Sequence, residues 1–392
     1  MEMKHLDKLE EVLNESVQSG QIAGGNICIL HKGHEIYYAQ AGYADLSKKK
    51  KIAKDSIFRL YSMTKPVTSA AVMLLMEQGK IDLLDPISMY IPSFTNMTVA
   101  SEMGDFPAQR PVTIKDCLSM TSGLPYNCDP DPASRDAAII FEEVDKRLYS
   151  KQPMTTLEVA SRLGEGRLAF QPGASWRYGT SADILGAVVE VVSGMRFGEF
   201  LKKNFFEPLG MIDTDFSVTA SKRDRLTKVY EQTETGLVEY NGSHLGICSH
   251  MDADIQFESG GAGLVSTITD YAHFTQMLLH NGTYQGQSYL SPQTVHYMTN
   301  CRLYPHQQVS MMGWDSLAGY SYSNLMRIMT DPSLAVINAS MGEYGWDGWL
   351  GPYFSNMPKE EMTFLMMVQR KDSGTFTLTR KLRNVLAAQL PL

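Results

Sequence analysis

Residues Phe58 to Gly79 read FRLYSMTKPVTSAAVMLLMEQG. Apolar residues recur at helical spacing from Val67 onward, and Gly79 is a residue type that commonly ends a helix. The pattern predicts a buried helix that begins at about Ser62. Pro66 is compatible with the first turn of this helix, because an amide hydrogen at that position has no partner within the helix.

Ser62 and Lys65 form an SxxK pair at the start of the predicted helix. A spacing of three residues places the hydroxyl and the amine on one face, one turn apart, so the amine can take the serine proton. The helix N-terminus offers free amide hydrogens to an oxyanion, and apolar surroundings lower the pKa of a lysine. The pair suits a nucleophile and its base, but the pattern alone is weak because it occurs again at Ser47 to Lys50.

Strand patterns lie toward both ends of the chain. Near the N-terminus, an amphipathic helix precedes a hairpin that turns at Lys32-Gly33. Near the C-terminus, strands precede a final amphipathic helix from about Thr377 to Leu386. The expected strands are Asn26 to Leu30, His34 to Gly42, Tyr320 to Met329, Ala335 to Ala339 and Thr363 to Gln369.

The middle of the chain, residues 82–254, is richer in short helical patterns and in Pro and Gly breaks. We therefore predict an α/β (α+β) fold in which an antiparallel sheet, flanked by helices, is built from the N- and C-terminal segments. The predicted domains are a sheet domain of residues 1–81 and 255–392 and an inserted, mainly helical domain of residues 82–254. The active site is expected in the cleft between them.

Composition excludes several classes of protein. The 392 residues include 35 Lys and Arg against 43 Asp and Glu, a net charge of −8, which gives no electrostatic reason to bind nucleic acid. Neither a signal-peptide core nor an apolar run of about 18 residues occurs, so we expect a cytoplasmic protein without membrane association. The five cysteines are scattered and odd in number, which fits a reducing compartment. These patterns leave the oligomeric state open.

The context of Ser62 resembles the serine β-lactamase and penicillin-binding-protein superfamily, most closely its class C branch and the family VIII carboxylesterases. Further stretches follow in the family's order over nearly the whole chain. They are Gly79 to Leu83 with Asp85-Pro86, Thr113 to Leu124, Phe170 to Gly173 with Trp176 and Tyr178, Pro208 to Met211, Ser259 to Thr267, and Gly345 to Gly348. The resemblance implies a β-lactamase/transpeptidase-like fold and a reaction that needs no metal or organic cofactor.

In this family a tyrosine from the helical domain shuttles protons with the lysine. Tyr322 and Asn324 match the family's YxN pattern, but they lie in an alternating aromatic stretch that is typical of a strand. Tyr178 follows a family motif and Trp176, so the resemblance favours Tyr178 as the third catalytic residue. Thr180 then stands where the family has Asn, and replacing that amide by a hydroxyl counts against recognition of amide substrates.

The family's Lys-Thr-Gly motif corresponds here to Trp346-Asp347-Gly348. The resemblance implies that Gly348 lets this strand approach the substrate, and that the amides of Trp349 and Ser62 form the oxyanion pair. Loss of the lysine removes the charge that would hold a penicillin or peptide carboxylate, which favours an uncharged ester. Asp347 departs from the family pattern, and its charge would repel an oxyanion. We expect Asp347 to face away from the bond that is cleaved; the alternative is that it selects a cationic or hydroxylated substrate.

Two further groups of residues have simpler explanations than a site. His244, Cys248, His250, Asp252 and Asp254 are metal-ligand types, but their spacing matches no familiar site, so a polar loop without metal is expected. Aromatic residues near the motifs could line an acyl pocket, although core packing is the simpler explanation for each. They are Tyr61, Tyr126, Trp176, Trp314, Trp349 and Tyr353.

The resulting functional prediction is a serine hydrolase that cleaves small esters with short or medium acyl chains through an acyl-enzyme on Ser62. Weak β-lactam hydrolysis is a side activity that the same chemistry allows. Three alternatives remain open: an acyltransferase that uses an alcohol or amine, a β-lactamase or amidase, and a catalytically silent acyl-binding sensor. The presence of Ser62, Lys65 and Tyr178 together argues against the silent sensor.

Overall fold

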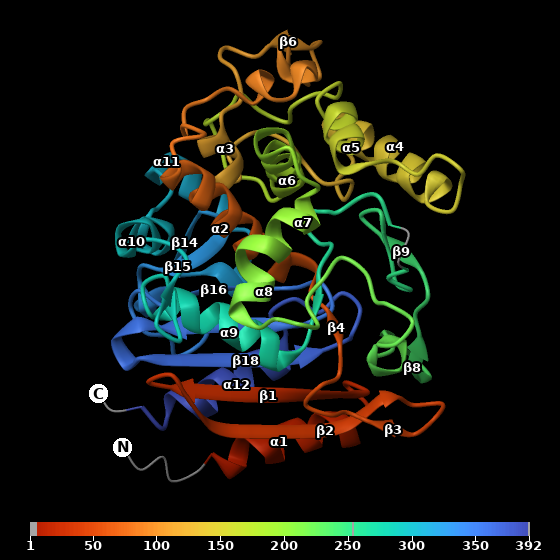
Figure 1. Ribbon diagram of the computed structural model, residues 1–392, viewed down its shortest axis with the longest axis vertical. Helices are drawn as coiled ribbons and strands as arrows, with labels where there is room; N and C mark the ends of the chain where they lie inside the picture. The colour runs from red at the N-terminus through yellow and green to blue at the C-terminus, as the bar shows by residue number, and fades with distance from the viewer. Residues whose placement is uncertain (1–5, 253–254, 391–392) are drawn as a thin grey trace.

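The computed structural model of the chain describes residues 6–252 and 255–390. Eight strands form its main sheet: β1 (Gly24–His31), β2 (His34–Asp45), β3 (Lys50–Lys51), β14 (Tyr320–Ser323), β15 (Met326–Met329), β16 (Tyr344–Asp347), β17 (Tyr353–Met357) and β18 (Met362–Val368). Their order is β14-β15-β16-β17-β18-β1-β2-β3, and every neighbouring pair is antiparallel (Figure 1). Gly25 lies opposite Val368, so segments from both ends of the chain share one sheet, as predicted.

Alternate residues of β1 face opposite sides of the sheet, as the pleat requires. Ile27 and Ile29 pack against helices α1 (Asp7–Gln18) and α12 (Thr377–Ala387), which contact each other on this face of the sheet. Cys28 and Leu30 belong to the larger core on the other face, where α9 (Ile268–Leu279) packs on β18. The sheet therefore has helices on both faces, and its upper face supports the candidate site.

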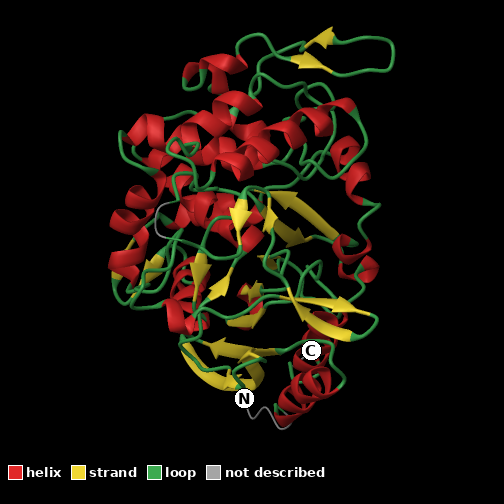
Figure 2. Cartoon of the chain, turned by 90° about the vertical axis from the view of Figure 1, so that its right-hand side faces the viewer, coloured by secondary structure: helices red, strands yellow, loops and turns green. Residues whose placement is uncertain are grey.

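The remaining helices gather mainly above the sheet, as Figure 2 shows in red. Three of these helices are preceded by a capping residue: Thr113, Asp131 and Thr155. The side chain of each capping residue accepts an amide hydrogen from the first turn of its helix. These helices, with the others, are α2 (Thr64–Glu77), α3 (Ile114–Leu118), α4 (Pro132–Arg147), α5 (Thr156–Leu163), α6 (Ser181–Ser193), α7 (Phe197–Leu201), α8 (Glu207–Leu209), α10 (Pro292–Asn300) and α11 (Pro305–Gln308). Helix α6 packs on α2, which carries Lys65.

Short strand pairs lie outside the main sheet. They are β4 (Phe58–Arg59) with β11 (Val265–Ser266), β5 (Thr98–Val99) with β6 (Phe106–Pro107), β7 (Tyr230–Thr233) with β8 (Gly236–Glu239), β9 (Ser243–His244) with β10 (Ile247–Cys248), and β12 (Thr283–Tyr284) with β13 (Gln287–Ser288). The amide of Tyr230 donates to the carbonyl of Gln369 at 3.0 Å, so part of the predicted insertion runs beside the sheet. The domain boundaries at 82 and 254 stay a prediction.

Two strand predictions near the C-terminus are wrong. The stretch Tyr320–Met329 is a hairpin, because Asn324 and Leu325 both adopt left-handed backbone angles, with φ of 49° and 61°, and turn the chain between β14 and β15. No glycine marks this turn, so the alternating sequence pattern continues across it without a break and predicts one long strand. Residues Ala335–Ala339 form irregular chain after the short helical turn Pro332–Leu334. In the described part of the chain, no helix combines the length and apolar character needed to cross a bilayer.

Candidate active site

Ser62 lies in a single 3-10 turn, Tyr61–Met63, that leads from β4 directly into α2. Tyr61 adopts a left-handed backbone with φ of 44°, which a bulky residue rarely does, and this strained turn directs Ser62 toward the cavity. Lys65 follows one turn later and is fully buried. Its Nζ donates to the Ser62 Oγ at 3.1 Å. The structure thus brings the predicted nucleophile and base into hydrogen-bond contact.

The Lys65 amine has two further partners. Its Nζ donates to the Gly261 carbonyl at 2.8 Å and to the Tyr126 hydroxyl at 2.9 Å. Burial lowers the pKa of Lys65 to about 7, and the negative charges of Asp183 and Asp347 oppose a further fall. A lysine with this pKa is partly neutral at physiological pH, and a neutral amine can accept the Ser62 proton.

Asp183, on α6, organises the loop that supports Lys65. Its Oδ1 accepts hydrogen bonds from the Ser259 hydroxyl and, at 3.0 Å, from the Gly261 amide. A Cβ atom on Gly261 would lie 2.9 Å from the Tyr126 hydroxyl, so the close approach leaves no room for a side chain. Sequence reasoning placed Gly261 in a family stretch but missed the role of both residues, because nothing in their local pattern places them beside Lys65.

Two phenols converge on the pair from the helical region. The Trp346 Nε1 donates to the Tyr178 hydroxyl at 2.8 Å, and the Tyr178 ring centre lies 4.6 Å from the Lys65 Nζ. Burial raises the pKa of Tyr178, and the polar side chains of Ser62 and Trp346 oppose the rise. Tyr126 contacts Lys65 instead, although its sequence context indicated only core or pocket packing. Tyr322 is buried in β14 with its ring against Trp346, which is consistent with the strand predicted for it.

The predicted Trp346-Asp347-Gly348 motif forms the end of β16 and the turn after it. A Cβ on Gly348 would lie 2.1 Å from the Leu60 carbonyl oxygen, so only glycine allows this close packing against the chain that leads to Ser62. Trp349 follows, with its ring packed on Tyr61 at a centroid distance of 4.9 Å. The residues predicted to supply both oxyanion amides therefore lie in adjacent segments.

Asp347 points toward neighbouring protein groups. Its Oδ2 accepts from the Thr375 hydroxyl at 3.0 Å, and its Oδ1 lies 3.6 Å from Nη1 of buried Arg327. Burial raises the pKa of the Asp347 carboxyl, and the Arg327 charge opposes this rise. Thr180 lies away from the cavity surface: it is fully buried, and its hydroxyl has no hydrogen-bond partner among the described residues.

These residues surround a cavity of about 410 Å³ with Ser62 in its wall. Its lining is rich in aromatic rings, with polar groups from one loop at the rim. The lining includes Tyr61, Ser62, Tyr126, Cys128, Tyr178, His244, Leu245, Trp314, Ser316, Trp346, Asp347, Gly348, Trp349, Asp372, Ser373, Gly374 and Thr375. Trp314 and Trp349 thus belong to a pocket wall, the alternative that sequence reasoning ranked below core packing. The cavity combines a nucleophile, a base and a place for an organic substrate.

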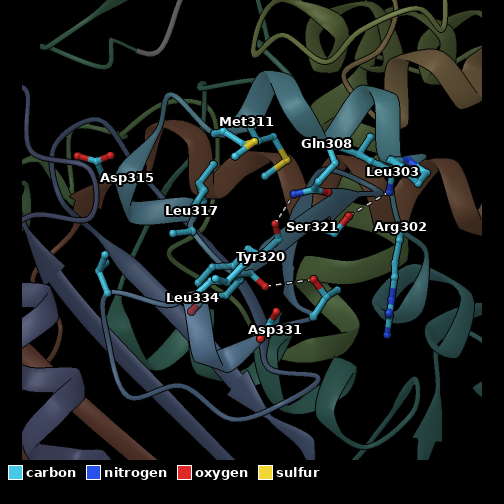
Figure 3. A pocket seen from close by; sticks show the side chains of 16 residues that line it. Arg302, Leu303, Gln308, Met311, Asp315, Leu317, Tyr320, Ser321, Asp331 and Leu334 are labelled. Carbon is cyan, nitrogen blue, oxygen red and sulfur yellow. Dashed lines mark hydrogen bonds between the residues drawn. The ribbon is translucent and has the colours of Figure 1, made fainter.

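A larger cavity of about 680 Å³ lies elsewhere (Figure 3). Met311, Leu317, Tyr320 and Leu334 line it, and its Ser321 hydroxyl accepts the Leu303 amide at 3.0 Å. No lysine occurs among the described residues that line it, so it holds no second SxxK-like pair. One segment separates the two spaces, because Trp314 and Ser316 line the smaller cavity while Asp315 and Leu317 line the larger one.

The residues considered as metal ligands do not form a cluster. His244 stacks on Trp349 at a centroid distance of 4.0 Å, whereas Asp252 accepts from the Tyr149 hydroxyl at 2.8 Å. Across residues 6–252 and 255–390, no group of three or more His, Cys, Asp or Glu side chains is placed to hold a metal ion. Asp254 lies outside the described residues.

Known proteins are similar to this chain in sequence and in fold. Esterase EstB of Burkholderia gladioli is 25% identical over 88% of this chain and 85% of its own, and the lovastatin esterase of Penicillium rubens is 27% identical over the same shares. The solved structure of EstCE1, a hydrolase with promiscuous acyltransferase activity, has a TM-score of 0.82 over 99% of both chains at 24% identity, so the folds agree. The family model described as Beta-lactamase matches residues 7–389. The chain therefore belongs to the Beta-lactamase family.

Proposed function

We propose that this protein is a serine hydrolase that cleaves carboxylic esters with short or medium acyl chains through an acyl-enzyme on Ser62. The observation that carries the proposal is the 3.1 Å hydrogen bond between Lys65 Nζ and Ser62 Oγ, at the wall of a cavity large enough for a small ester. The depressed pKa of Lys65, about 7, gives the base a neutral form at the pH where it would act. Two of its relatives are named as esterases.

The reaction would proceed in two acyl transfers. The Ser62 Oγ attacks the ester carbonyl while its proton passes to Lys65, and the amides of Ser62 and Trp349 stabilise the oxyanion. Tyr178, which lines the same cavity as Ser62, would pass a proton to the departing alkoxide as the carbon–oxygen bond breaks. Water then attacks the acyl-enzyme and gives its proton to the Tyr178 oxygen, while Lys65 returns its proton to the departing Ser62 oxygen, so the carboxylic acid is released and the enzyme is restored.

Ester cleavage is favoured over peptide or penicillin cleavage by what the cavity lacks. Among the described residues that line it there is no Lys or Arg to hold a substrate carboxylate. Thr180, where the family has an amide, is buried away from the cavity surface. β-Lactam hydrolysis would therefore be a slow side activity.

Acyl transfer to an alcohol is a second candidate. The aromatic walls of the cavity can hold an apolar alcohol next to the acyl-enzyme, where it would compete with water. EstCE1, which has the same fold, is described as a hydrolase with promiscuous acyltransferase activity. Adding a primary alcohol during ester turnover separates the two: new ester indicates transfer, and free acid alone indicates hydrolysis.

The proposed function is tested by trapping the acyl group. Rapid acid quenching during turnover of a chromogenic butyrate ester should yield protein with one added butyryl group, which peptide mass spectrometry should locate on Ser62. A fluorophosphonate, which loses fluoride and forms a stable phosphonate ester with an activated serine, should label the same residue. Label on another residue, or none during active turnover, would contradict the acyl-enzyme.

The two phenols should differ in their effects on catalysis. Because Tyr178 lines the same cavity as Ser62 and lies next to the Lys65 amine, Tyr178→Phe should lower kcat/KM about 10²-fold to 10³-fold, the range of a lost acid–base group. Tyr126→Phe should lower kcat/KM about tenfold. It should also lower the pH at which kcat/KM is half its maximum, because it removes a hydrogen-bond acceptor from the charged Lys65 amine. Steady-state rates between pH 5 and 9 with one neutral ester, a pH span in which a lysine of pKa about 7 titrates, measure both effects. A larger loss of kcat/KM in Tyr126→Phe than in Tyr178→Phe would assign the acid–base role to Tyr126 and the supporting role to Tyr178.

A further inference from the structure

The candidate cavity is acidic as well as aromatic. Two carboxylates line it, Asp347 and Asp372, and no Lys or Arg is found among its described lining residues. His244 adds no positive charge, because burial lowers its pKa to about 4. Lys65 reaches the site from beneath Ser62 and is partly neutral near pH 7. A substrate in this space therefore faces negative charge with little positive charge at the surface.

Asp372 carries the exposed charge at the rim. Its Oδ1 accepts from the Trp349 Nε1 at 2.6 Å, and its side chain is 66% exposed. Lys371 Nζ lies 3.7 Å from the Asp372 Oδ2 but only 2.5 Å from the Glu231 Oε1, so Glu231 largely compensates this lysine. The Asp372 charge is thus available to a ligand, and its hydrogen bond fixes the indole of Trp349.

Asp347 is the second carboxylate residue in the cavity lining, and the arginine next to it, Arg327, is buried in the protein. Arg327 is 2% exposed, does not line the cavity, and has its guanidinium carbon 4.4 Å from the ring centre of Tyr353. The 3.6 Å separation from Asp347 leaves this pair without a hydrogen bond. The positive member therefore lies in the protein interior, whereas the negative member is one of the residues that line the cavity.

The rings between these carboxylates suit a cation. Trp349 stacks with neutral His244, and Trp314, which also lines the cavity, packs edge-on against Tyr178 at a centroid distance of 5.5 Å. Aromatic faces attract ammonium groups through their quadrupoles, and the attraction is strongest where water is excluded. Carboxylates next to such rings add Coulombic attraction of the same sign.

We propose that this cavity selects esters that carry a positively charged ammonium group, with Asp372 and Asp347 as specificity-determining residues and Trp349 as an aromatic contact. The inference rests on the proposed ester hydrolysis and adds the substrate class. The ammonium group stays bound while the ester bond breaks, so the chemistry at Ser62 is unchanged. An ester of equal shape without the charge would bind less well, and an anionic ester would be the poorest substrate.

The test uses pairs of esters that differ in one atom. In the first pair, a butyrate ester of choline is compared with its neutral isostere, in which carbon replaces the quaternary nitrogen. In the second pair, the same replacement is made at the end of the acyl chain of a chromogenic ester. A preference of about tenfold or more in kcat/KM for the charged member of either pair is expected, since one tenfold step corresponds to about 1.4 kcal/mol.

Variants identify the source of the preference. Asp372→Asn keeps an oxygen to accept the Trp349 hydrogen bond but removes the charge, so the ratio of charged to neutral ester should fall about threefold or more. Asp347→Asn should lower the same ratio. Asp315→Asn is the matched control, because Asp315 belongs to the larger cavity and its loss changes the net charge equally; its ratio should equal that of the wild type.

The outcomes separate the inference from the proposed function. Equal or slower turnover of the charged member in both pairs, with neutral esters hydrolysed normally, overturns the cation preference and leaves the esterase standing. An unchanged ratio in both Asp372→Asn and Asp347→Asn overturns their assignment as specificity determinants. If neither charged nor neutral esters form an acyl group on Ser62, the proposed function itself fails.

Discussion

Ser62→Ala should abolish ester hydrolysis, with a loss of kcat/KM of about 10⁴-fold or more, as expected when a nucleophile is removed from a catalytic set that acts as a unit. The substitution deletes one oxygen atom at the cavity wall and leaves the amide of residue 62 in place. The unfolding temperature should therefore remain close to that of the wild type, which circular dichroism can verify alongside ester assays.

The second SxxK sequence of the chain supplies the matched control. Ser47 lies in the turn between β2 and β3, where its hydroxyl donates to Asp45 Oδ1 at 2.7 Å, and it does not line the candidate cavity. Ser47→Ala should retain wild-type activity. Hydrolysis that survives in Ser62→Ala but disappears in Ser47→Ala would move the nucleophile to the other motif and invalidate the proposed mechanism.

Lys65→Met should reduce kcat/KM about 10³-fold to 10⁴-fold, because no other amine contacts the Ser62 hydroxyl among the described residues. Methionine approximates the length of the lysine stem and suits the buried position. In the wild type, kcat/KM for an uncharged ester should rise with pH and reach half its maximum near pH 7, as Lys65 loses its proton. The variant should lack this rise of kcat/KM with pH. A rise that persists near pH 7 would assign the role of base to another residue.

The same substitution has a measurable effect on folding. The pKa of Lys65 falls from 10.5 to about 7 when the protein folds. Below pH 7 the amine is protonated in both the folded and the unfolded state, so the whole free-energy cost of burying its charge lowers the stability of the protein. This penalty disappears as the pH rises toward 10.5, because the unfolded chain then also loses the proton. Relative to Lys65→Met, the wild type should gain free energy of unfolding between about pH 7 and 10, measurable by urea denaturation.

Much of the candidate site follows from local sequence because its first two members are neighbours on one turn. A serine and a lysine three residues apart meet wherever the chain is helical, and the apolar pattern after Val67 predicted that helix. Tyr178 could be chosen only through its motif context, since the distance from Ser62 along the chain carries no geometric information. The prediction of Gly348 has a similar basis, and its close contact with the Leu60 carbonyl supplies a physical reason for it.

Other contacts arise only from packing between distant segments. Tyr126, Asp183 and Gly261 meet around one amine, yet no local sequence pattern connects any of them with Lys65. The hairpin turn at Asn324 and Leu325 escaped prediction because its left-handed angles are adopted by residues other than glycine. Such features depend on tertiary interactions that override local preference.

The pairing of β1 with β18 also has a consequence for how the protein is made. The ribosome releases the β1–β2 hairpin early in translation. The strand that pairs with the other edge of β1 is β18, in which Val368 lies opposite Gly25, and it emerges only near the end of translation. Until then the nascent chain exposes an unpaired strand edge, which invites association with other chains. Synthesis of this protein should therefore be most vulnerable to aggregation before its last strand appears, and translation products that stop short of β18 should accumulate as insoluble material.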